Sequence, residues 1–253
     1  MKLYSEYPHA SISMSKDSKF KEVITKLLQE GKVKSILESG TFNGLGSTTM
    51  LCELITKNNI TLNHFYTIEV EEPMYQQAIL NLQKYPFVKP LWGMSLSKED
   101  CLNFIDNDEA INNHEKYPDI FIDSTENPKE FYKNEIEGSL SIKISAKKKI
   151  TDTITSFFQK PSIKNAVPQD CFKKYIPQIE NDCPIILLDS AGGVGLLEFQ
   201  TVMSIMKDKP FYLILDDVHH LKHFRSLEFV RKNNSFNILA ENLEQGWVVA
   251  KYL

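Results

Sequence analysis

The fold of this chain follows from one segment, ILESGTFNGLGSTTM, residues 36–50. Its apolar run ends in Glu38 and enters a turn with glycines at Gly40, Gly44 and Gly46, after which a helical pattern begins. A strand, a glycine-rich turn and a helix in this order form a ligand-binding unit of α/β proteins, because backbone approaches a ligand closely only where no Cβ intervenes. The G-x-x-x-G-x-G spacing matches neither the dinucleotide pattern nor the phosphate loop. Phosphate is therefore not the predicted ligand.

Strand and helix patterns alternate on both sides of this turn. Short apolar runs predict buried strands at 33–37, 64–68, 88–91, 185–189 and 211–215, with helical patterns between them. Such alternation predicts an α/β fold with a doubly wound, mostly parallel, Rossmann-like sheet. The ending FNILAENLEQGWVVAKYL predicts two strands joined by a turn near Gly246. This antiparallel hairpin would complete a seven-stranded sheet.

The alternation lapses between residues 106 and 183, which predicts an inserted lid or substrate subdomain between core strands 3 and 4 of a single domain, 1–253. Within it, YPDIFID (117–123) also resembles a strand. We prefer 185–189 as strand 4, because a glycine-rich turn and one helix connect it to the next strand. Residues 138–174 carry eight lysines, which attract an anionic substrate or simply form a solvated surface. These are Lys143, Lys147, Lys148, Lys149, Lys160, Lys164, Lys173 and Lys174.

Composition narrows the class of protein. With 253 residues and 42% hydrophobic content, the chain can bury a sizeable core, and its net charge of -4 argues against binding nucleic acid or anionic membranes through bulk charge. No uncharged apolar run approaches the ~20 residues of a membrane helix, and the N-terminus lacks an apolar leader. We expect a cytoplasmic protein without a membrane or nucleic-acid partner, which could form a homo-oligomer.

Acids follow the predicted strands. Glu69 ends the second strand, and Asp189 and Asp216 end the fourth and fifth, with Asp217 next in the chain. Neighbouring strands lie about 5 Å apart, so these aspartates should be close together. Close carboxylates repel unless a cation neutralises them, and oxygen ligands suit a hard divalent ion such as Mg²⁺. The sequence therefore predicts a metal site at Asp189, Asp216 and Asp217.

Glu38 together with the glycine spacing resembles motif I of the class I S-adenosylmethionine-dependent methyltransferases, E/D-x-G-x-x-x-G-x-G. The resemblance implies that the turn lies against the amino-acid end of this cofactor, that Glu38 helps to hold its ammonium group, and that Glu69 accepts the ribose hydroxyls. It also places LWGMSLS (91–97) beside the adenine. The implied cofactor-binding residues are Glu38, Gly40, Thr41, Phe42, Gly44, Gly46, Ser47, Glu69, Gly93, Met94, Ser95 and Asp189.

The three aspartates are similar to those of the metal-dependent O-methyltransferases, the catechol and macrocin groups. This resemblance implies that Mg²⁺ binds the acceptor hydroxyl, lowers its pKa and places its oxygen in line with the methyl group of the cofactor. The chain departs from both groups at Ala191 and Gly192, where the macrocin group keeps another acid and the catechol group a lysine. A general base must then come from elsewhere.

DDVHHLKHF (216–224) offers candidates for this base: His219, His220, Lys222 and His223. We favour His219 or His220 as catalytic, because both are close to the aspartate pair and an unperturbed histidine has a suitable pKa. Glu198 can reach the site or simply lie on the following helix, and we favour the helix.

The expected function is a Mg²⁺-assisted O-methyltransferase acting on a small acceptor, such as a sugar, a nucleotide-sugar or a natural-product intermediate. Two alternatives stay open. The same fold can carry another metal-dependent chemistry, of a hydroxylase or lyase, or it can serve as a non-catalytic cofactor-binding protein.

Overall fold

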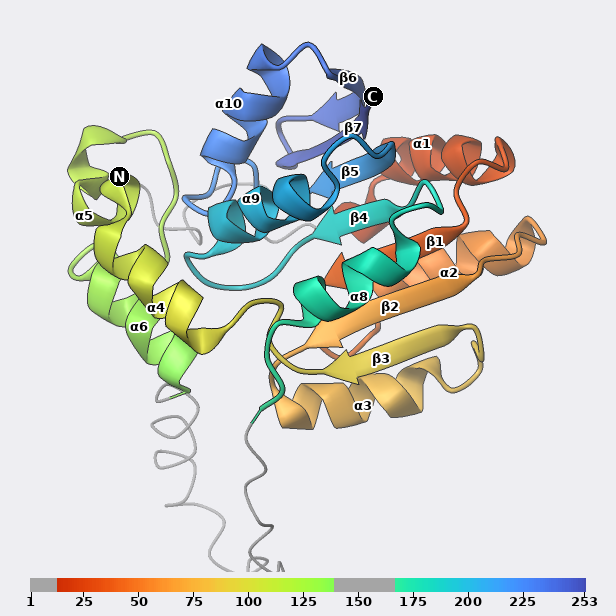
Figure 1. Ribbon diagram of the computed structural model, residues 1–253, viewed down its shortest axis with the longest axis horizontal. Helices are drawn as coiled ribbons and strands as arrows, with labels where there is room; N and C mark the ends of the chain where they lie inside the picture. The colour runs from red at the N-terminus through yellow and green to blue at the C-terminus, as the bar shows by residue number, and fades with distance from the viewer. Residues whose placement is uncertain (1–12, 139–166) are drawn as a thin grey trace, which may run out of the picture.

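The computed structural model describes residues 13–138 and 167–253, and in these ranges the chain forms one seven-stranded sheet (Figure 1). The strand order is β3-β2-β1-β4-β5-β7-β6. Strands β1 to β5 run parallel, whereas β7 is antiparallel to both β5 and β6. The predicted parallel sheet and its C-terminal hairpin are thus confirmed. The bounds are β1 Ser35–Ser39, β2 His64–Glu69, β3 Val88–Trp92, β4 Ile185–Leu188, β5 Phe211–Leu215, β6 Phe236–Asn242 and β7 Trp247–Tyr252.

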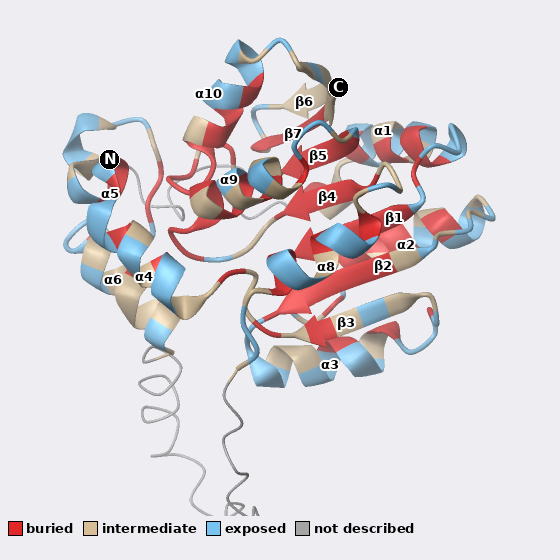
Figure 2. Ribbon diagram, viewed as in Figure 1, coloured by how far each residue is buried: buried red, intermediate tan, exposed pale blue. Residues whose placement is uncertain are grey.

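Helices cover both faces of the sheet, and the central strands β1, β2, β4, β5 and β7 are largely buried, whereas the edge strands β3 and β6 are partly exposed (Figure 2). Alternate strand residues point to opposite faces, so Ile36 packs in the cluster formed with α1, α2 and α3, and Leu37 in the cluster formed with α8, α9 and α10. Burial on both faces explains why the parallel strands are continuous apolar runs. These helices are α1 Ser18–Gln29, α2 Ser47–Lys57, α3 Glu72–Leu82, α8 Cys171–Ile179, α9 Gly195–Ile205 and α10 Phe224–Lys232.

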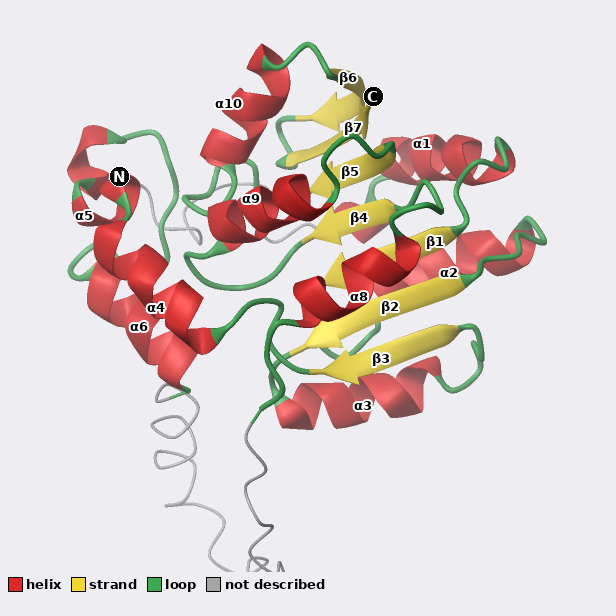
Figure 3. Ribbon diagram, in the orientation of Figure 1, coloured by secondary structure: helices red, strands yellow, loops and turns green. Residues whose placement is uncertain are grey.

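Three further helices lie beside the carboxyl ends of the parallel strands (Figures 1 and 3). They are α4 Lys98–Asn107, α5 Glu109–Asn112 and α6 Pro128–Glu137, with short 3-10 turns at Met14–Lys16 and His114–Lys116 elsewhere in the chain. The Arg225 guanidinium on α10 pairs with the buried Asp108 carboxylate at 2.8 Å, and the rings of Tyr117 and Phe224 are 5.1 Å apart. The helical group is therefore docked on α10 at the edge where a parallel sheet binds ligands.

The strand-like stretch 117–123 does not enter the sheet. Phe121 N donates to the His219 carbonyl and Leu221 N to the Phe121 carbonyl, both at 2.9 Å, so this stretch forms one isolated parallel bridge beside the loop after β5. Strand 4 is Ile185–Leu188, which confirms the preferred assignment. No helix in the described ranges is both long and apolar enough to cross a membrane.

The predicted insertion, 106–183, contains an element of the core. Helix α8 packs on β1 and β2, and its Phe172 is fully buried in the cluster on that face of the sheet. Phe172 is therefore part of the core that covers this face of the sheet. Most of the lysine-rich segment, with Lys143 to Lys164, lies outside the described residues, so its predicted role stays a prediction.

Candidate active site

The glycine turn after β1 lies against the end of β4. Gly40 has φ +98°, and a Cβ there would lie 2.2 Å from the carbonyl oxygen of Asp189. The backbone N–H groups of Gly40 and Thr41 both donate to the Ile68 carbonyl at 3.1 Å. Because the chain leaves β1 toward β2 on one side and returns at β4 on the other, this contact lies at the topological switch point of the sheet.

The other two glycines of the turn differ in what surrounds them. Gly44 has φ +79°, and its missing Cβ leaves room for the Leu82 side chain, 3.0 Å from the Cβ position. Among the residues that the structure describes, and apart from its two chain neighbours, nothing lies within 4 Å of a Cβ built on Gly46, which precedes α2. Packing of the protein on itself therefore requires a glycine at Gly40 and Gly44, and leaves open space beside Gly46.

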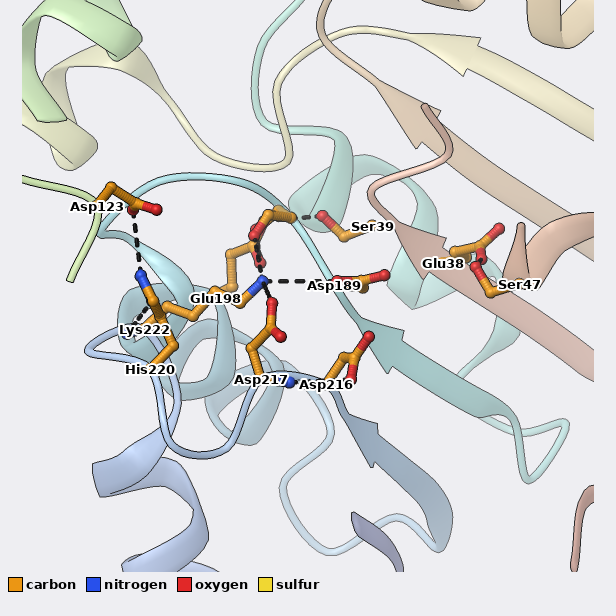
Figure 4. A network of polar contacts seen from close by, with 11 residues as sticks. Glu38, Ser39, Ser47, Asp123, Asp189, Glu198, Asp216, Asp217, His220 and Lys222 are labelled. Atoms are coloured by element: carbon orange, nitrogen blue, oxygen red, sulfur yellow. Dashed lines mark hydrogen bonds and ion pairs between the residues drawn. The ribbon is translucent and has the colours of Figure 1, made fainter. Parts of the chain in front are cut away.

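Glu38 is buried and binds protein hydroxyls. Its carboxylate accepts hydrogen bonds from Ser47 at 2.5 Å, Thr48 at 2.6 Å and Thr67 at 2.7 Å. Burial raises the pKa of Glu38, and the three hydroxyls oppose that rise. The carboxylate points to the start of α2 (Figure 4), where it also complements the positive end of the helix dipole. Glu38 thus fixes the turn, and its predicted contact with the cofactor ammonium stays a prediction.

Glu69 connects the end of β2 with the glycine turn. One carboxylate oxygen accepts from Phe42 N at 2.6 Å and the other from Glu71 N at 2.8 Å. Burial raises the pKa of Glu69, while these backbone donors lower it. A carboxylate has about four lone-pair sites, so both oxygens can accept a further hydroxyl. Glu69, the residue predicted to bind the ribose, therefore lies beside the glycine turn.

The segment predicted to lie beside adenine is held by the chain entering α8. Met94 N donates to the Pro168 carbonyl at 2.8 Å, and Cys171 N donates to the Met94 carbonyl at 3.1 Å. Phe172 N bonds the Ser95 carbonyl, and a Cβ on Gly93 would lie 2.8 Å from the Cys171 sulfur. These backbone groups are engaged within the protein, so adenine contact at 93–95 stays a prediction.

Two of the three predicted metal ligands, Asp189 and Asp217, contact the ammonium of Lys222. Lys222 Nζ lies 2.7 Å from an oxygen of Asp217 and 3.5 Å from an oxygen of Asp189, and it donates to the Ser190 carbonyl at 3.0 Å (Figure 4). The Asp216 carboxylate accepts from Asp217 N at 3.0 Å. Within the described residues, no group of three or more acids, histidines or cysteines is arranged to hold a metal ion.

The charges of this group depend on one another. Burial raises the pKa of Asp189 and, further, that of Asp216, whose aspartate neighbours add to the rise. The Lys222 side chain is only 6% exposed, yet the adjacent carboxylates hold its pKa above the ordinary value, so it is an ammonium. A cation already neutralises these acids, and the residues as arranged do not fit a divalent ion. The magnesium site is a prediction without support here.

The two histidines predicted as catalytic have other partners. His219 Nε2 lies 2.7 Å from the Leu243 carbonyl in the β6–β7 turn. His220 is buried, its Nδ1 accepts from Lys222 N at 3.1 Å, and its Nε2 lies 3.1 Å from a carboxylate oxygen of Asp123. These contacts lead away from the aspartate group. The role of either ring as a general base stays a prediction.

Glu198 on α9 bonds residues at the ends of two strands. It is fully buried on α9, and its carboxylate accepts from Ser39 at 2.8 Å and Ser190 at 2.6 Å. The preferred assignment to the helix alone was therefore incomplete, because the side chain joins the ends of β1 and β4. Helical periodicity places Glu198 on α9 but does not reveal these partners. Asp123 lies in the stretch beside the loop after β5, and no sequence motif marks it as a site residue.

A separate hollow of about 390 Å³ lies between α4, the Asp108–Glu109 turn and α9. It is lined by Phe104 and Leu197 among others, and by none of the predicted cofactor or metal residues. The candidate site therefore rests on the strand ends and the glycine turn.

Comparison with known proteins gives distant structural likenesses. No protein-family model matches the chain, and a search of curated proteins finds no match. Among solved structures, an O-methyltransferase from Bacillus cereus in complex with SAH is 13% identical with a TM-score of 0.46, over 94% of this chain and 82% of that chain. TomG from Streptomyces achromogenes, an O-methyltransferase involved in tomaymycin synthesis, in complex with SAM, is 11% identical with a TM-score of 0.42, over 93% and 78%.

A third solved structure, precorrin-6y C5,15-methyltransferase from Geobacter metallireducens, is 10% identical with a TM-score of 0.44, over 98% of this chain and 95% of that chain. At these identities and TM-scores, the likenesses do not assign a function to this chain.

Proposed function

We propose that this protein is an S-adenosylmethionine-dependent methyltransferase that methylates a hydroxyl group of a small acceptor. One observation carries the proposal: the glycine turn and Glu69 meet at the topological switch point. Glu69 accepts from Phe42 N at 2.6 Å within the turn, and Gly40 of the same turn abuts the Asp189 carbonyl. In open α/β sheets, ligands bind outside the carboxyl ends of the strands at this point.

The proposed cofactor position follows from the open side of the turn. The amino-acid end would lie against the backbone at Gly46, where the described part of the chain leaves the space of a Cβ open. The ribose hydroxyls would donate to Glu69, whose oxygens keep unused lone pairs. Glu38 would act through Ser47, which its carboxylate holds at 2.5 Å. This role differs from a direct contact with the cofactor.

The acceptor would lie next to the aspartates at the ends of β4 and β5. Asp189 borders both regions, because its carbonyl lies against the glycine turn and its carboxylate faces Lys222. In the proposed step the acceptor oxygen forms a bond to the methyl carbon as the sulfur–methyl bond breaks, and the hydroxyl proton leaves to a base. The surrounding acids give an anionic acceptor no support, so a neutral polyol, such as a sugar, fits this edge better.

Calorimetric titration of the full chain with S-adenosylmethionine and its demethylated product tests the proposal. We expect micromolar binding by the wild type, with at least tenfold weaker binding for Gly46→Ala and for Glu69→Gln. Gly46→Ala adds a methyl group where a ligand would approach, and Glu69→Gln removes one of two acceptor oxygens.

Glu72→Gln is the matched control, since Glu72 is exposed at the start of α3 and should leave the affinity unchanged. Absence of cofactor binding by the folded wild type would refute the proposal. Equal affinities of the Glu69 and Glu72 variants would refute the assigned ribose position.

A further inference from the structure

The ammonium of Lys222 occupies the space between carboxylates that the sequence assigns to a metal ion. Its nitrogen is 2.7 Å from Asp217, 3.0 Å from the Ser190 carbonyl and 3.5 Å from Asp189, and these oxygens come from the ends of β4 and β5 (Figure 4). An ammonium has three donors, and three oxygens surround this one.

The backbone and the neighbouring packing hold Lys222 in this place. Lys222 N donates to His220 Nδ1 at 3.1 Å, and His220 is buried beside Asp123. A Cβ built on Gly195 would lie 2.8 Å from the Lys222 Cβ and 2.9 Å from its carbonyl oxygen. The base of the side chain is therefore tightly packed against the beginning of α9, and the ammonium at its other end is held by its contacts with Asp217 and Ser190.

We propose that Lys222 is the resident cation of this site and replaces the divalent ion predicted for Asp189, Asp216 and Asp217. A magnesium ion needs near-octahedral oxygen ligands at 2.0–2.1 Å, whereas here a hydrogen-bonded nitrogen lies among the oxygens. A second cation next to a fixed ammonium would also be repelled. The assignment does not depend on which group the enzyme transfers.

One consequence rests on the proposed function. With the ammonium bonded to protein oxygens, the carboxylates of Asp189 and Asp217 are available to accept a hydrogen bond from the acceptor. The acceptor would then be held as a hydrogen-bond donor rather than as a metal-bound oxygen. Cofactor affinity of the wild type should be the same in excess chelator and in millimolar Mg²⁺.

Titration with Mn²⁺, followed by electron paramagnetic resonance of the free ion, tests the proposal directly. We expect no saturable site in the wild type up to millimolar Mn²⁺. Lys222→Ala frees the carboxylates and should gain one site at least tenfold tighter than any in the wild type, and Lys222→Ala with Asp217→Asn should lose it. Lys232→Ala, which removes an exposed lysine on α10, should resemble the wild type.

A wild-type Mn²⁺ site that disappears in Asp217→Asn would overturn the proposal. A Lys222→Ala variant that folds, as judged by circular dichroism, yet gains no site would overturn it as well. If Lys222→Ala is unstable, Lys222→Gln keeps a side chain of similar length, carries no charge and offers an amide oxygen to the ion, so the same outcome applies to it. Titration of the same samples with S-adenosylmethionine tests the proposed function independently, because the Mn²⁺ result does not depend on whether the cofactor binds.

Discussion

Two of the glycines in the turn are required by the protein itself, and Gly40 is the more constrained. Its φ of +98° lies in the region that L side chains rarely adopt, and its Cβ position overlaps the Asp189 backbone. Backbone cannot move aside as a flexible side chain can. A single absent methyl group therefore sets the distance between β1 and the end of β4, where the acids begin.

Gly40→Ala should lower the free energy of unfolding by at least about 2 kcal/mol, since it adds a backbone overlap to an unfavourable φ. Urea denaturation followed by circular dichroism measures this loss. Gly46→Ala is the matched control and should cost less than about 1 kcal/mol, the scale of changing a helix N-cap residue. Similar losses in both variants would contradict the packing argument.

Helix α1 is fastened to the C-terminal hairpin by its own N-cap. Asp17 accepts from Lys19 N at 2.8 Å, and its other oxygen accepts from Asn242 at 2.8 Å and from the Trp247 indole at 2.9 Å. The Phe20 ring meets the Trp247 ring edge-on at 5.1 Å. The Asp17 side chain thus caps α1 and also joins this helix to the C-terminal hairpin, more than 200 positions away in the sequence.

Asp17→Ala should destabilise the protein by about 2–4 kcal/mol, because it removes a cap and leaves the buried Trp247 N–H without an acceptor. Thermal and urea unfolding measure the change. Glu22→Ala on the same helix removes only an exposed pair with Lys26 and should cost less than about 0.5 kcal/mol. An Asp17→Ala variant as stable as this control would show that the hairpin does not depend on the cap.

The helical group α4–α6 meets the sheet at the candidate site. Asp123 pairs with His220, and Glu135 on α6 reaches toward the loop after β4, with its Oε2 3.3 Å from the Cβ position of Gly192. That oxygen is buried and has no hydrogen-bond partner in the part of the chain that the structure describes. Burial and the charges of Asp123 and Glu71 raise the pKa of Glu135 to about 7, against an opposing effect of Lys222.

Stability should therefore fall as the pH rises through this pKa. Between the unfolded value near 4.3 and about 7, the folded state binds more protons at Glu135 than the unfolded state, so ionisation favours unfolding. From pH 5 to pH 8, the wild type should lose about 2 kcal/mol relative to Glu135→Gln. Urea unfolding at several pH values gives this difference. Glu137→Gln, an exposed change on the same helix, should follow the wild type, and parallel profiles of wild type and Glu135→Gln would contradict the prediction.

The sequence by itself determined the sheet and the positions of the candidate ligand-binding residues on it. Apolar runs, helical periodicity and the glycine spacing are local patterns, so the parallel strands, the hairpin and the acids at the strand ends could be predicted. Strand 4 was also identified, because the β4–β5 crossover has its own local signature. The tertiary structure alone decided the partners of buried polar groups.

Lys222 was one of four candidates in a polar segment, and only the fold showed it between Asp189 and Asp217. Glu198 and the rings of His219 and His220 are similar cases, because their contacts depend on the directions of side chains from elements far apart in the sequence. Periodicity assigns a residue to a face of an element. Packing between elements decides which charge it meets there, and so decides that the predicted metal position holds an ammonium.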